Sequence, residues 1–217
     1  MKSSHKGFTL VEIAIVLVII GLLLGGILKG QEMITQAKTK NVIADFSGIS
    51  AAYHGYQDRY RAIPGDDNGS AARWTTPPAV SGNGNGQVAG TYNADCTVAT
   101  LPESCLWWDH LRRSGFVAGS GPQQPFNAAA GMMGVQTGDA AGGAIFGGFS
   151  GLIICSANLP DKIAIAVDTQ MDDGVPATGT VRGMLQGAPN PALGPGTAAT
   201  AAYAETGTNV YILCRAL

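Results

Sequence analysis

A single carboxylate inside a long apolar run near the N-terminus constrains this chain more than any other feature. The residues from Phe8 to Leu28 are apolar or small except for Thr9 and Glu12. This length matches the roughly 20 residues that a helix needs to cross the hydrocarbon core of a bilayer. Lys2 and Lys6 precede the run, and basic residues favour the cytoplasmic side of a membrane. We therefore expect a membrane-anchored precursor with its leader in the cytoplasm.

Glu12 needs a cationic partner. A carboxylate within a membrane span costs about 2.5–3.5 kcal/mol even on insertion scales, and such residues are functional by default. Cleavage after Gly7 would create an amino terminus at Phe8, one helical turn from Glu12 and at the same membrane depth. That ammonium group is the partner that the sequence favours.

The leader and the start of the apolar run resemble a known processing signal. Residues 7–12, with the sequence Gly-Phe-Thr-Leu-Val-Glu, and the apolar run that follows are similar to the class III signal of type IV pilins and type II secretion pseudopilins. The resemblance implies that a prepilin peptidase cuts after Gly7 and methylates Phe8. It also implies that Glu12 pairs with the N-terminal ammonium of a neighbouring subunit and sets the register of a filament.

Two simpler interpretations compete with this one. A secretory signal has an apolar core of about 7–15 residues and an A-x-A-like cleavage site, whereas this run is longer and no such site follows before Lys29. An ordinary membrane anchor explains the run and the basic leader but gives no reason for Glu12.

Charge and composition bound the rest of the chain. Removal of Lys2 and Lys6 leaves 13 − 2 = 11 basic side chains against 15 acidic ones, a balance of −4, so we predict no nucleic-acid partner. The 31 glycines and 11 prolines predict many turns, and the apolar fraction of 46% suffices for one core.

Four cysteines follow the membrane segment, which favours disulfides in an oxidising compartment. Three pairings are possible. Cys155 and Cys214 each end an apolar run that is typical of a strand, and Cys96 and Cys105 flank a short polar segment. We therefore expect Cys96 to pair with Cys105 and Cys155 with Cys214.

The N-terminal helix is expected to continue beyond the membrane. Apolar residues recur there in steps of four and three, which predicts one stripe packed against a head. The expected organisation is a cleaved leader (1–7), a membrane and filament-core helix (8–28), its amphipathic continuation (29–61) and a globular head (62–217). The stripe comprises Val42, Phe46, Ile49, Tyr53, Tyr56 and Tyr60.

The head is expected to have an α+β fold. A short helix is predicted from Pro102 to Gly115, and strands are predicted at 151–155, 163–167, 180–185 and 209–214. The connections are too poor in helix for parallel crossovers, so the sheet should be antiparallel, with the long helix packed on one face.

Asp168, Asp172 and Asp173 provide the main metal hypothesis, and Asp66, Asp67 and Asn68 provide a weaker one. The first three residues cluster carboxylate oxygens, the ligand type that calcium prefers, in a segment predicted to be a loop between two strands. Some type II secretion pseudopilins bind calcium in a C-terminal loop, but Asp-Asp-Gly is also an ordinary turn sequence. Calcium is therefore the one cofactor considered.

Catalysis has little support in the sequence. His110 stands beside Asp109, but no nucleophile accompanies them in a known pattern, so no enzyme is predicted. Trp107 and Trp108 suggest either an adhesive surface or core packing of Trp107 with an exposed neighbour.

The predicted function is that of a structural subunit. The precursor is expected in the bacterial inner membrane, and the mature protein in a surface or periplasmic filament built from copies of itself. Its expected partners are the prepilin peptidase and methyltransferase and the inner-membrane assembly machinery. The alternatives are a type II secretion pseudopilin and a membrane-anchored binding protein that does not polymerise.

Overall fold

The computed structural model describes residue 7, residues 9–140 and residues 143–217. The chain divides into two compact units, Met1–Ala37 and Lys38–Leu217. Helix α1 (Leu10–Tyr60) begins in the first unit and ends in the second, where Tyr60 is the last residue of the predicted apolar stripe. The leader residues 1–6 and Phe8 lie outside the described residues.

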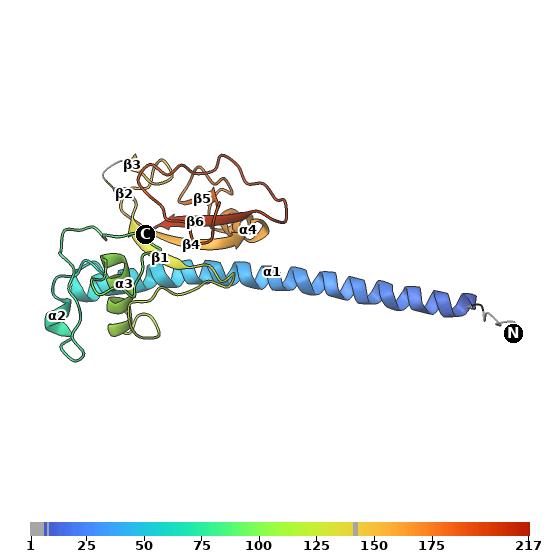
Figure 1. The fold of residues 1–217 in the computed structure, drawn as a ribbon, viewed down its shortest axis with the longest axis horizontal. Coiled ribbons are helices and arrows are strands. Elements are labelled where there is room, and N and C mark those ends of the chain that lie inside the picture. The colour runs from blue at the N-terminus through green and yellow to red at the C-terminus, as the bar shows by residue number, and fades with distance from the viewer. Residues whose placement is uncertain (1–6, 8, 141–142) are drawn as a thin grey trace, which may run out of the picture. The chain divides into compact units, whose positions relative to one another are not determined.

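The second unit contains an antiparallel sheet with the strand order β1-β4-β6-β5 (Figure 1). Helix α4 follows β4 directly, a two-stranded ribbon follows β1, and the two other short helices lie between α1 and β1 in the chain. The sheet and α1 give the pilin-like α+β arrangement that the sequence predicts. The strands of the sheet are β1 (Met133–Thr137), β4 (Leu152–Pro160), β5 (Val181–Leu185) and β6 (Val210–Ala216), the ribbon is β2 (Asp139–Ala140) with β3 (Gly143–Ala144), and the helices are α2 (Ser70–Arg73), α3 (Glu103–Arg113) and α4 (Asp161–Met171).

One face of the sheet packs against helices. Leu152 and Ile154 of β4 and Leu213 of β6 share a buried cluster with residues of α1, α3 and α4. Each α1 member lies three or four residues from another member, as one helical face requires. They are Val42, Phe46, Ile49, Ala52, Tyr53 and Tyr56.

Loops cover the opposite face of the sheet. Ile153 and Cys155 of β4 pack there with Phe146 and Phe149 from the connection before β4 and with Leu193 from the loop after β5. Both faces of β4 are therefore buried. This explains why its sequence is a continuous apolar run instead of an alternating one.

The segment 163–167 is helical, so the strand predicted there is wrong. Ile163, Ala164 and Val167 are buried and alternate with more exposed residues in the 3.6-residue rhythm of a helix, not the two-residue rhythm of a strand. The carboxylate of Asp161 accepts hydrogen bonds from the Lys162, Thr206 and Gly207 amides and fixes the start of α4.

Candidate assembly site and membrane segment

The first unit presents an apolar surface on every side of α1. Its long apolar side chains between Leu10 and Ile34 are between 45% and 90% exposed. Among the described residues, α1 is the one helix long and apolar enough to cross a membrane. Exposure of this much apolar surface to water is unfavourable, so the segment needs lipid or other helices around it.

Thr9 and Glu12 form a capping box at the start of α1. Glu12 Oε2 accepts hydrogen bonds of 2.8 Å from both the amide and the hydroxyl of Thr9, and the Glu12 amide donates to Thr9 Oγ1 at 3.3 Å. This arrangement satisfies backbone donors that a helix start leaves free. The partnership is absent from our sequence prediction, although the pattern Thr-x-x-Glu would have revealed it.

The predicted processing site lies at the edge of the described residues. Gly7 is exposed and precedes the helix. Phe8, the predicted site of methylation, lies outside the described part. Cleavage and methylation therefore stay predictions from the sequence.

The arrangement of a long apolar N-terminal helix and an antiparallel α+β head is that of a pilin-like subunit. Residues 2–28 match the family model of the prokaryotic N-terminal methylation motif, the class III prepilin signal. Comparisons with curated proteins and with solved structures give no significant match. The motif and the fold together support a pilin-like or pseudopilin subunit that is made as a membrane-anchored precursor.

Two disulfides brace the head. Cys96 is joined to Cys105, and Cys155 to Cys214, the pairing expected from the sequence. The second bridge links β4 to β6 at directly opposite positions. It connects residues 59 apart in the sequence and secures the C-terminal strand in the middle of the sheet.

The three aspartates of the metal hypothesis come together at the C-terminal end of α4. Carboxylate oxygens of Asp168, Asp172 and Asp173 lie within 4.8 Å of one another. Asp168 belongs to the helix, not to a loop between strands as predicted, and its Oδ2 atom accepts a 2.6 Å hydrogen bond from Tyr203. Its Oδ1 atom is buried without a hydrogen bond of normal geometry. Burial raises the pKa of Asp168, and the Tyr203 hydroxyl acts in the opposite direction.

His110 and Asp109 form structural contacts within the head. The Nδ1 atom of His110 accepts a hydrogen bond from the Gly65 amide at 2.9 Å, and Nε2 donates to the Val80 carbonyl at 2.8 Å. Asp109 pairs with Arg113 at 2.6 Å. Both ring nitrogens are thus engaged in fixing the loop after α1.

Trp107 and Trp108 are both fully buried, so the expectation that one tryptophan is exposed is wrong. The α1 stripe covers one side of α3, and Trp107 stacks on Tyr53 with ring centroids 5.3 Å apart. Trp108 faces the same core cluster, and Arg112 lies over its ring.

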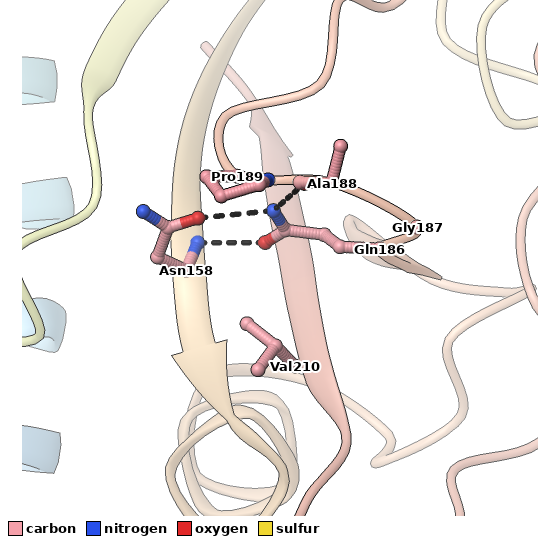
Figure 2. Close-up of a pocket in the computed structure, with 6 residues that line it drawn as sticks. All are labelled: Asn158, Gln186, Gly187, Ala188, Pro189 and Val210. Atoms are coloured by element: carbon pink, nitrogen blue, oxygen red, sulfur yellow. Dashed lines mark hydrogen bonds between the residues drawn. The ribbon is translucent and has the colours of Figure 1, made fainter.

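A shallow hollow of about 340 Å³ opens beside the end of β4 (Figure 2). Asn158 and Gln186 face each other there through two hydrogen bonds, from Asn158 N to Gln186 Oε1 at 2.6 Å and from Gln186 Nε2 to Asn158 Oδ1 at 3.1 Å. The remaining lining residues are Gly187, Ala188, Pro189 and Val210. These hydrogen bonds link β4 to the loop after β5. The lining of the hollow carries no charged side chain.

Proposed function

We propose that this protein is the structural subunit of a type IV pilus-like filament. In this proposal, prepilin peptidase cuts after Gly7 and methylates Phe8, and the mature chain leaves the membrane to polymerise through α1. The observation that supports it most directly is the exposed apolar helix whose methylation motif carries the Thr9–Glu12 capping box.

The capping box supports a specific assembly step. In the membrane, the Thr9 hydrogen bonds stabilise the Glu12 carboxylate, which otherwise has only lipid around it. On assembly, the ammonium group of Phe8 from a neighbouring subunit approaches the same carboxylate. Apolar helices gain little from association in lipid, so this charge pair and close packing decide the register.

Electron microscopy of cells that express the wild type, Glu12→Gln or Glu32→Gln tests the proposal. Glu12→Gln keeps the side-chain size and removes the charge, so we expect filaments to be lost or irregular. Glu32→Gln removes a carboxylate from the same helix, where the exposed Glu32 contacts only Lys29 and Gln36 of its own helix, so it should assemble normally. Normal filaments from Glu12→Gln would contradict the proposed assembly step.

The location of the filaments separates the related functions. Filaments on the cell surface support a pilus, whereas filaments confined to the periplasm, accompanied by a secretion defect on gene deletion, support a type II secretion pseudopilin. Absence of wild-type filaments under all conditions, with the protein present in the membrane, would indicate a binding protein that does not polymerise.

We also propose that the three aspartates at the end of α4 bind calcium. The buried Oδ1 atom of Asp168, which has no hydrogen bond of normal geometry, supports this proposal, because a cation would satisfy it together with the carboxylates of Asp172 and Asp173. Calcium should raise the melting temperature of the full-length protein in detergent, whereas magnesium should not. Asp173→Asn should reduce the calcium effect, and an unchanged melting temperature of the wild type would contradict calcium binding.

A further inference from the structure

A second hollow of the head runs along α1. It has a volume of about 270 Å³, and α1 and the loop after α3 form its sides. Gly48 leaves space on the helix side, since a Cβ atom there would meet nothing within 4 Å. Its lining includes Asp45, Gly48, Ile49, Phe116, Phe126 and Met133. We call this hollow the Gly48 groove.

The Gly48 groove is apolar and open to solvent. Phe116 is 37% exposed and Phe126 is 65% exposed, and these are the exposed phenylalanines of the described residues. Two aromatic side chains that share one exposed groove favour an apolar partner over water. The space over Gly48 is suited to the close approach of another helix.

A carboxylate without a partner lies within this apolar lining. Asp45 is half-buried, and no hydrogen bond or ion pair involves it in the part of the chain that the structure describes. Burial raises the pKa of Asp45, which means that its charged form is poorly solvated. A partner that brings a cation to the groove would therefore be favoured.

We infer that the Gly48 groove binds the segment Leu22–Ile34 of α1 from a second copy of the chain, with Lys29 of that copy placed at Asp45. This inference rests on the proposed polymerisation. The segment offers exposed apolar side chains at Leu22 and Met33, which lie seven and four residues from Lys29 and so share its face of the helix.

Lys29 provides the matching charge. It is the first cation after the apolar run. Its present partner is Glu32, at 2.8 Å, and both side chains are more than half exposed. An exposed pair of this kind contributes little stability, so exchanging Glu32 for Asp45 costs little.

Photo-crosslinking in the full-length protein tests the occupant of the groove. A benzoylphenylalanine at position 126, in cells that assemble filaments, should crosslink to peptides within residues 22–34 of a second copy. The same residue at position 185 is a control, because Leu185 is also exposed (43%) but does not line the groove. Crosslinks to lipid, to another protein or to head residues alone would overturn the inference.

Substitutions provide an independent test. Gly48→Leu adds a side chain whose Cβ atom has open space in the monomer and whose remaining atoms occupy the groove, so it should reduce the filament protein recovered by shearing about tenfold. Ser47→Leu adds the same side chain at an exposed neighbouring position outside the groove lining and should assemble normally. Equal assembly of Gly48→Leu and the wild type would also overturn the inference.

The charge pair has its own test. Asp45→Lys and Lys29→Asp should each reduce assembly, and the double variant should restore it. Failure of the double variant to recover assembly would contradict the proposed contact between Lys29 and Asp45. If the wild type forms filaments but position 126 does not crosslink to residues 22–34, the groove inference fails alone, whereas absence of wild-type filaments contradicts the proposed function itself.

Discussion

The amide and the hydroxyl of Thr9 both lie 2.8 Å from Glu12 Oε2, so one carboxylate oxygen receives two hydrogen bonds at the start of α1. Thr9→Val should remove the hydroxyl and the cap while keeping the side-chain shape. Loss of an N-cap costs about 0.5–2 kcal/mol, so we expect sheared filament protein to fall by about twofold to about thirtyfold.

Thr9→Ser is the matched control because serine keeps the hydroxyl. It should assemble as the wild type does, with the amounts compared by quantitative immunoblotting of sheared and cell-bound fractions. Wild-type assembly by Thr9→Val would show that the hydroxyl has no role in holding Glu12.

The two disulfides should differ in their contribution to stability. The Cys155–Cys214 loop has a sequence separation of 59, against 9 for Cys96–Cys105. In the chain-entropy picture, their removal costs about 4 and about 2.6 kcal/mol, respectively. Denaturant unfolding of the Cys→Ala pair variants in detergent, followed by tryptophan fluorescence, measures this difference. A larger loss from the Cys96–Cys105 pair would contradict the prediction.

His110 should make the head sensitive to acid. Burial lowers the pKa of His110 in the folded state, although the Val80 carbonyl acts in the opposite direction. The unfolded chain then binds a proton more readily, near its ordinary pKa of about 6.5. Stability should therefore be lost as the pH falls from that value through the folded pKa, by at most about 1.4 kcal/mol per pH unit for one proton.

The pH dependence of His110→Gln provides the comparison. Glutamine retains a donor for the Val80 carbonyl but does not titrate. The free energy of unfolding of the wild type should fall more steeply between pH 7 and pH 5 than that of the variant. Parallel pH profiles would exclude His110 as the titrating group.

Two glycines should respond to alanine in opposite directions. A Cβ atom at Gly134 in β1 would collide with the backbone of Tyr92, so Gly134→Ala should destabilise the head by about 1–3 kcal/mol. Gly48 lies in α1 with open space beside it, so Gly48→Ala should stabilise the helix by about 0.5–1 kcal/mol. Equal melting temperatures of the two variants would contradict the described backbone packing at Gly134.

The long helix and the two strands that carry Cys155 and Cys214 could be predicted from the sequence because their signals are local. The stripe from Val42 to Tyr60 keeps the helical spacing of three and four residues throughout. Helix α1 ends at Tyr60, because Arg61 has a positive φ and the turn residues 64–69 follow shortly after. Apolar runs that end at Cys155 and Cys214 indicated their pairing, since residues opposite each other in neighbouring strands are close enough for a disulfide. The strands themselves continue beyond both cysteines, to Pro160 and Ala216.

Other features depended on contacts that no local pattern records. The alternation of isoleucine and alanine at 163–166 fits both a strand and a helix, and its burial against the sheet decides for the helix. Strand β1 was missed because Gly134 has no side chain to mark it. The position requires glycine because the Tyr92 backbone occupies the space of a Cβ atom. The second tryptophan, Trp108, is buried in the core cluster with residues of α1 and the sheet, which are far from it in the sequence.

Mass spectrometry of the N-terminus of the protein recovered from its native host tests the central claim most directly. The account predicts a chain that begins at Phe8 and carries one methyl group on its α-amino nitrogen. A filament-associated protein that still begins at Met1, or that begins elsewhere than Phe8, would contradict it.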